Sequence, residues 1–357
     1  MNDRLHASVH VLVIILIIGW LLYAGSAVFV PIVFSIIVVY VIVGSVRMLG
    51  RVPVIGPVLP VSVCYALSIL LLAGVIFLAV TMVAANKDAM LALAPRYQES
   101  VLTQLHKGAL LLRIDTEPTW DSLRRGVVAQ LNIQSLIGTM VASLSGFMVK
   151  VFVVALYACF LLIERRMFAD KLAAMAPNAQ SAARISSVID DINDRIGAYL
   201  ALKTILGLVQ GVLCWGVMKL MGLEFAGLWA MLIALLNYIP YIGSVLGIFF
   251  PTLMSLVQFG QSGETLALLI SLTAIHFLVG NVLDPYLMGN SLNLSPFAIL
   301  AGMAIWSAIW GVAGAFLAIP IMVSTTIICS QFPMTRPIAV LLSKNGRLST
   351  SVNLPAL

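Results

Sequence analysis

Charged residues are scarce in this sequence. Only 10% of the 357 residues are Asp, Glu, Lys or Arg, whereas 61% are hydrophobic and the mean hydropathy is +1.08. Soluble globular proteins typically carry about 25% charged and roughly 45–50% apolar residues. So few charged side chains cannot cover so much apolar surface in water. The composition excludes the soluble enzyme classes and predicts an all-α polytopic membrane protein in a lipid bilayer.

Motifs for catalysis and for metal, phosphate or nucleic-acid binding are also missing. The sequence has no HExxH, no P-loop and no Ser/His/Asp set, so it predicts neither an enzyme nor a cofactor. The 20 Lys and Arg residues give a net charge of +6 but form no basic stripe, which argues against a nucleic-acid partner. The four cysteines show no paired spacing, and we interpret them as packing residues: Cys64, Cys159, Cys214 and Cys329.

Six apolar runs are long enough to cross a bilayer core of about 30 Å, which takes about 20 helical residues. They cover residues 9–25, 28–46, 58–84, 144–163, 196–221 and 266–283. Residues 85–143 carry more charge and keep apolar residues at helical spacing. This pattern favours an amphipathic helical insert broken at Pro95 and Pro118, with a solvated connector as the alternative. Lys and Arg gather in the other short loops, which predicts both termini in the cytoplasm and the insert outside.

Two apolar stretches in the C-terminal third are each too long for one span. Residues 225–259 are interrupted by N-Y-I-P-Y-I-G (237–243), and residues 296–329 are divided by Gly311, Gly314 and Pro320. We predict two helical hairpins in addition to the six spans, with eight or more complete spans as the alternative. The predicted organisation has five parts. Three transmembrane helices cover 1–84, the insert covers 85–143, and a fourth span with a cytoplasmic amphipathic helix covers 144–195. A unit with both hairpins covers 196–332, and a cytoplasmic tail covers 333–357.

The two hairpins give the C-terminal part an internal repeat. A span and a hairpin at 196–259 are followed by an oppositely oriented span and hairpin at 266–329. Inverted repeats with helices broken near the middle of the membrane are typical of secondary transporters. The pattern therefore predicts a pathway lined by the few polar residues of these segments, since polar groups in lipid are costly unless they line protein or water.

The first candidate group is N-Y-I-P-Y-I-G. Pro240 lacks a backbone donor and Gly243 permits a tight turn. Freed carbonyls and the side chains of Asn237, Tyr238 and Tyr241 could then face a polar solute or an ion. A plain turn between two spans is the alternative.

The second candidate group is one face of the span at 196–221. Small and polar residues recur on it at three- and four-residue spacing: Lys203, Gly207, Gln210, Gly211 and Cys214. Lys203 lies two turns inside the cytoplasmic end, so its side chain could instead extend to the lipid headgroups. Gln210 lies deeper and is the stronger candidate.

The third candidate group closes the span at 266–283. His276 and Asp284 share a predicted helical face with Gly280, and Asn281 lies beside them. A His and an Asp on one face could relay a proton or bind a cation. The alternatives are a buried structural histidine and a helix end at Asp284 and Pro285.

Three motifs in the C-terminal half carry a resemblance to a known family. They are N-Y-I-P-Y-I-G, N-V-L-D-P-Y-L-M-G-N-S-L-N-L-S-P (281–296) and W-S-A-I-W-G-V-A-G-A-F-L-A-I-P (306–320), preceded by Y-L-A-L-K-T (199–204). Together they resemble the autoinducer-2 exporter family of TqsA/PerM-like bacterial membrane transporters, over residues 199–320. Ser307 stands where that family often has a glycine, so packing or substrate at the second hairpin could differ.

The resemblance implies a homo-oligomeric secondary transporter of the bacterial cytoplasmic (inner) membrane, for which a pentamer is one candidate assembly. The best-known activity of the family is export of a small hydrophilic molecule, the quorum-sensing signal autoinducer-2. We expect the solute site between the hairpins, and the second hairpin adds Trp306, Trp310, Gly311, Gly314 and Pro320 to it. The alternatives are a sodium (cation)/proton antiporter and a non-transporting membrane scaffold or regulatory protein.

Overall fold

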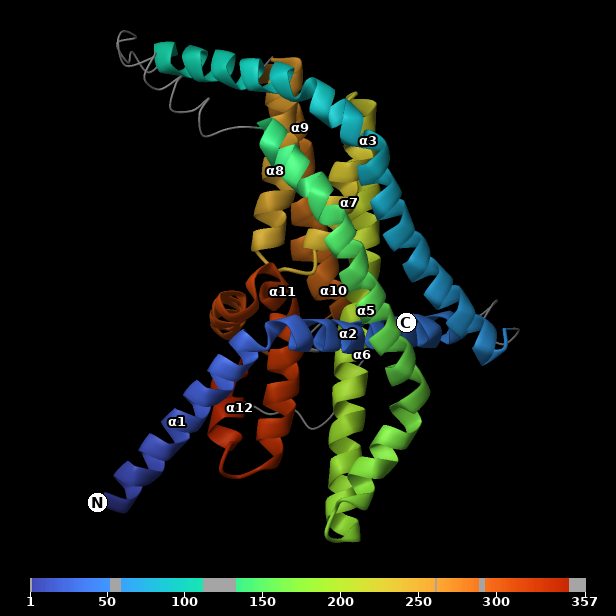
Figure 1. Cartoon of the computed structure of the whole chain (residues 1–357), viewed down its shortest axis with the longest axis vertical. Coiled ribbons are helices and arrows are strands. Elements are labelled where there is room, and N and C mark those ends of the chain that lie inside the picture. The colour runs from blue at the N-terminus through green and yellow to red at the C-terminus, as the bar shows by residue number, and fades with distance from the viewer. Residues whose placement is uncertain (1, 52–58, 112–132, 261, 289–292, 347–357) are drawn as a thin grey trace. The chain divides into compact units, whose positions relative to one another are not determined.

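The computed structural model describes residues 2–51, 59–111, 133–260, 262–288 and 293–346 (Figure 1). Within these ranges the chain forms helices and no β-strand. The elements are α1 (Asn2–Ala24), α2 (Ser26–Arg51), α3 (Val61–Leu111), α5 (Ile133–Ala174), α6 (Ala179–Leu220), α7 (Ala226–Leu236), α8 (Ile242–Phe259), α9 (Ser262–Phe277), the π-helix η1 (Leu278–Leu283), α10 (Asp284–Met288), α11 (Pro296–Gln331) and α12 (Arg336–Leu342).

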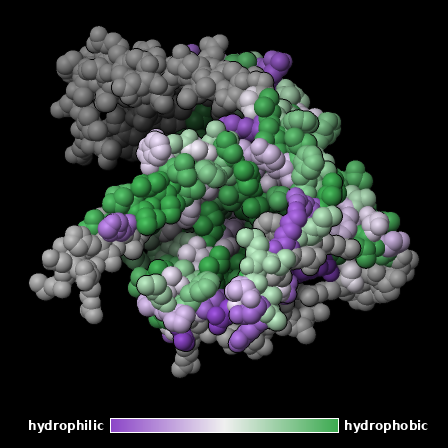
Figure 2. Space-filling view, turned by 60° about the horizontal axis from the view of Figure 1, so that its bottom comes forward, coloured by the Kyte–Doolittle hydropathy of each residue, from purple (hydrophilic) through white to green (hydrophobic). Residues whose placement is uncertain are grey.

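Among the described residues, seven helical stretches are long and apolar enough to cross a membrane, and α7 is a shorter apolar helix. The seven are Ser26–Arg47, Val61–Leu93, Gly146–Arg165, Ala179–Leu220, Ile242–Phe259, Gly263–Leu287 and Pro296–Gln331. Many of their large apolar side chains are exposed, and apolar residues cover much of the described surface in Figure 2. Lipid suits such a surface, and the prediction of an all-α polytopic membrane protein is confirmed.

Pro95 does not break the helix that carries it, so that part of the prediction is wrong. α3 runs through Pro95 without interruption. An interior proline removes one backbone hydrogen bond and costs about 3 kcal/mol, which the many other bonds of a 51-residue helix can offset. Pro118 lies outside the described residues.

The charged helix predicted after Pro177 and the fifth span predicted from residue 196 form one continuous helix, α6.

The chain divides into two compact units, and the two hairpins fall in different units. The first unit comprises Met1–Ser68, Lys150–Leu202 and Met288–Leu357, and the second comprises Ile69–Val149 and Lys203–Leu287. The first therefore contains α11, and the second contains α7 and α8.

In the first unit, α11 packs against α1 and α2. The Trp310 indole Nε1–H donates to the Leu22 carbonyl at 2.9 Å, and the rings of Phe34 and Phe316 stack at 5.4 Å between centroids. The ion pair between Arg47 and Asp194 at 2.6 Å is about half exposed on both sides. Such an exposed pair contributes at most about 1 kcal/mol to stability.

In the second unit, a core forms where α6, α7 and α9 meet. Its buried members are Cys214, Met218, Leu223, Ala226, Ala230, Ile233, Leu268 and Leu272. Gln258 at the end of α8 fixes the loop between α6 and α7, because its side-chain amide accepts from the Glu224 backbone N–H at 2.8 Å and donates to the Gly222 carbonyl at 2.9 Å. The base of the α7–α8 hairpin is thereby held at the end of α6.

Candidate functional site

The polar and small residues predicted on one face of α6 form a buried stripe. Lys203, Gly207, Gln210, Gly211 and Cys214 are all buried. A Cβ atom added to Gly207 would lie 2.8 Å from the Ala234 carbonyl oxygen, and one added to Gly211 would lie 3.2 Å from that of Ala230. The two glycines therefore let the backbone of α7 approach α6 closely.

An ion pair joins α6 to α10 within the second unit. Lys203 Nζ lies 2.6 Å from Asp284 Oδ2, and the two side chains are 7% and 22% exposed. Lys203 is thus paired inside the protein and does not extend to the headgroups. The other carboxylate oxygen, Oδ1, is shielded and has no hydrogen-bond partner. A buried carboxylate with one free oxygen can accept a hydrogen bond from a solute.

The helix does not end at Asp284 and Pro285 but widens before them. Residues 278–283 form the π-helix η1, and the Asp284 N–H donates to Val279, five residues earlier. The physical cause is Pro285, whose ring would clash with the carbonyl four residues before it and which has no N–H to offer. π-helical turns are frequent at functional sites.

The residues predicted to share a face with His276 differ in burial. His276 is buried at 5% exposure, whereas Gly280 and Asn281 are exposed. Val279 is also buried and Asp284 is partly buried. That His276, Gly280 and Asp284 share one face stays a prediction.

His276 lies between α9 and α8. Its Nδ1 is 2.9 Å from the Leu272 carbonyl oxygen, which can only accept, so the ring carries a proton on Nδ1. The second ring nitrogen, Nε2, has no partner and faces Gly247, where an added Cβ would lie 3.0 Å away. Eight helical residues separate His276 from Asp284, about 12 Å along the axis, so the two do not act as one contact pair.

The N-Y-I-P-Y-I-G segment forms the tip between α7 and α8, as predicted. Tyr238 Oη lies 2.6 Å from Thr204 Oγ1 and ties the tip to α6. Asn237 Nδ2 is buried and has no hydrogen-bond partner. Tyr241 has φ 61° and ψ −57°, and the Ile242 N–H donates to the Pro240 carbonyl at 2.6 Å. This is a γ-turn of the rare, strained kind, and such strain is concentrated at functional sites.

The second predicted hairpin is present in the first unit. α11 bends at Gly311, whose φ of 62° and ψ of −142° suit glycine alone. A Cβ added to Gly314 would overlap the Trp306 carbonyl, although eight residues of straight helix span about 12 Å. The two arms therefore fold back on each other, and the rings of Trp306 and Trp310 lie 5.0 Å apart between centroids. Pro320 is buried inside the second arm and does not divide it.

The structure brings several predicted residues together and adds one. Within the second unit, Lys203, Asp284 and the tip residues Asn237 and Tyr238 gather at one stretch of α6. Thr204 was not predicted as a pathway residue, although its position beside Lys203 in Y-L-A-L-K-T offered a signal. The residues of the second hairpin belong to the other unit and are described there alone.

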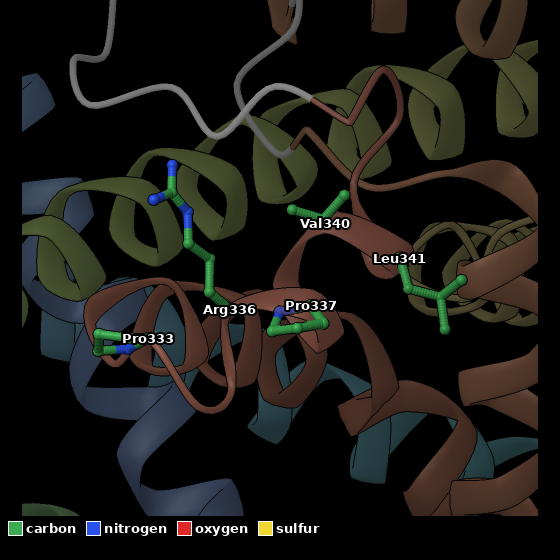
Figure 3. Close-up of a pocket in the computed structure, with 5 residues that line it drawn as sticks. All are labelled: Pro333, Arg336, Pro337, Val340 and Leu341. Carbon is green, nitrogen blue, oxygen red and sulfur yellow. The ribbon is translucent and has the colours of Figure 1, made fainter.

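No metal centre marks this region among the described residues. No group of three His, Cys, Asp or Glu side chains in the described ranges could hold a metal ion. A pocket lies at the start of α12, lined by Pro333, Arg336, Pro337, Val340 and Leu341 (Figure 3). It contains none of the predicted pathway residues.

Broken helices and a buried ion pair inside apolar helices are typical of polytopic α-helical membrane transporters. The family model for AI-2E family transporters matches residues 11–334, and the chain belongs to this family. The predicted relationship is therefore confirmed.

Three relatives illustrate the similarity. The chain is 34% identical over 205 residues to a protein of Borreliella burgdorferi named "Putative transport protein", covering 57% of this chain and 56% of that protein. It is 29% identical over 284 residues to the AI-2 transport protein TqsA of Escherichia coli K12, covering 79% and 80%. It is 32% identical over 183 residues to "Putative transport protein YhhT" of the same organism, covering 51% of each. The Borreliella match thus spans little more than half of that relative.

Proposed function

We propose that this membrane transporter is a secondary transporter that exports a small hydrophilic molecule, such as the quorum-sensing signal autoinducer-2. The observation that carries the proposal is the Lys203–Asp284 ion pair beside a strained helix tip and a π-helical turn. The name of its relative TqsA, AI-2 transport protein, supports the choice of solute.

In this proposal the polar side chains of the second unit replace the water that a solute loses on entering the membrane. Lys203 and Asp284 neutralise each other, so the site carries little net charge while it keeps a free carboxylate oxygen. Asn237 offers an unpartnered amide N–H and Gln210 a buried amide. The second hairpin, with Trp306, Trp310, Gly311, Gly314 and Pro320, is proposed to complete the pathway.

We also propose an orientation and an assembly. The basic short loops favour both termini in the cytoplasm of a bacterium, with the protein in the inner membrane. A homo-oligomer, with a pentamer as one candidate, is the proposed assembly.

Transport through these residues predicts a loss of flux when they are truncated. In proteoliposomes loaded with autoinducer-2, Asp284→Ala is expected to reduce flux at least about tenfold, since a hydrogen bond involving a charged group contributes about 1.5–3 kcal/mol. Gln210→Ala and Asn237→Ala remove neutral amides and are each expected to reduce flux about two- to tenfold, for about 0.5–1.5 kcal/mol. Ser271→Ala is the matched control, because this partly exposed α9 hydroxyl donates to the Ala267 carbonyl of its own helix. Wild-type flux in all three variants would contradict the assignment of these residues to the transport pathway.

Sodium/proton antiport is the second candidate, favoured by the intramembrane carboxylate of Asp284 and the buried ring of His276. It predicts that sodium added outside vesicles changes the pH inside, measured with an entrapped pH dye and with no organic solute present. Asp284→Asn is expected to abolish the response because the neutral amide neither binds a proton nor holds a cation. Choline in place of sodium is the control, and an equal response to choline rejects the antiporter.

A further inference from the structure

The π-helical turn leaves one backbone carbonyl without a donor from its own helix. In an α-helix the Asp284 N–H would donate to the Gly280 carbonyl, but here it donates to Val279. The next N–H in line would be that of residue 285, which is proline and has none. The Gly280 carbonyl oxygen is therefore available to accept a hydrogen bond from another group.

A second acceptor belongs to the same turn. Asp284 uses Oδ2 for Lys203 and leaves Oδ1 without a partner. Side chains on a helix lean toward its N-terminus, so the carboxylate leans back over the turn that carries the Gly280 carbonyl. Two unused oxygen acceptors thus lie one turn apart on the same helix.

The charge beside these acceptors decides which ligand suits them. A cation would have to bind close to the Lys203 ammonium, which already neutralises the carboxylate at 2.6 Å, and like charges repel strongly where water is excluded. A neutral group that donates hydrogen bonds meets no such repulsion. Hydroxyl groups on adjacent carbon atoms can supply two donors at this spacing.

We propose that the Gly280 carbonyl and Asp284 Oδ1 form a subsite that binds neighbouring hydroxyl groups of a neutral solute. The inference rests on the proposed function and names the part of the solute that the pathway recognises. Asn237 lies along the same stretch of α6, because its unpartnered Nδ2 is 3.5 Å from a Cβ added to Gly207, one turn along α6 from Lys203.

Pro285→Ala tests the subsite because it restores the missing N–H. The Gly280 carbonyl is then bonded within the helix, by residue 284 if the turn becomes α-helical or by residue 285 if it stays π-helical. We expect the half-saturation concentration for autoinducer-2 in proteoliposomes to rise about tenfold with little change in maximal flux, as for the loss of one hydrogen bond. Alanine favours a helix, so the variant is expected to fold. Pro31→Ala in α2 is the matched control and should leave both values unchanged.

The outcomes separate the subsite from the proposed function. An unchanged half-saturation concentration in Pro285→Ala, while Asn237→Ala still reduces flux, overturns the subsite and leaves the transporter proposal standing. Wild-type protein that carries no autoinducer-2 overturns both. An altered sodium-driven pH response in Pro285→Ala, with solute affinity unchanged, also overturns the subsite and assigns the turn to a cation.

Discussion

Lys203→Ala is expected to lower the free energy of unfolding by about 3 kcal/mol. Removing one member of a buried ion pair leaves the other charge without compensation, which typically costs about 3–5 kcal/mol. The lower end of this range applies because the Asp284 side chain is 22% exposed, so its carboxylate regains some solvation when the lysine is removed. Thermal or denaturant unfolding of the purified protein in detergent micelles measures the change.

Two further variants give this measurement its control. Lys203→Ala combined with Asp284→Ala removes both charges, so the double variant is expected to be more stable than Lys203→Ala alone. Lys219→Ala removes an exposed lysine from the last turn of α6 and is expected to change stability by less than about 0.5 kcal/mol. A loss at Lys219 equal to that at Lys203 would show that the ion pair contributes nothing.

Gly243→Ala is expected to prevent the α7–α8 tip from closing in its present form. The added Cβ would overlap the Leu236 carbonyl oxygen, which belongs to backbone and cannot turn aside. Overpacking of this kind costs about 1–3 kcal/mol, and here relief requires the two arms to separate. Flux and the thermal unfolding midpoint should both fall, with flux falling further because Asn237 and Tyr238 lie in the same tip.

Gly216→Ala is the matched control for this substitution. Gly216 lies in α6, and an added Cβ meets no atom within 4 Å. Alanine within a helix is about 0.5–1 kcal/mol more favourable than glycine, so this variant should gain stability. The two glycine-to-alanine changes are therefore expected to have opposite signs, and a gain in both would contradict the close contact at the tip.

Local features of the sequence predicted those parts of the molecule that depend on neighbours along the chain. The apolar runs predicted the helices, and the spacing of Lys203, Gly207 and Gln210 predicted the buried stripe on α6, because helical periodicity fixes which side chains share a face. The prolines and glycines predicted two helix breaks. The second break lies at Gly311, where φ is positive. The sequence did not distinguish Gly311 from Pro320 as the position of this break.

Contacts between distant segments could not be predicted in this way. Lys203 and Asp284 are 81 residues apart, and no pattern in the residues around either one predicts their contact. Pro285 indicated a change in the helix, and sequence reasoning interpreted it as an end rather than a widened turn. The positive φ of Tyr241 could not be predicted either, because tyrosine rarely adopts this conformation.

The short length of α7 has a consequence for the membrane itself. Its eleven residues rise about 16 Å, close to half the roughly 30 Å thickness of the hydrocarbon core. α8, with 18 residues, rises about 27 Å, so only the α7 arm of the hairpin is too short to cross that core as a straight helix.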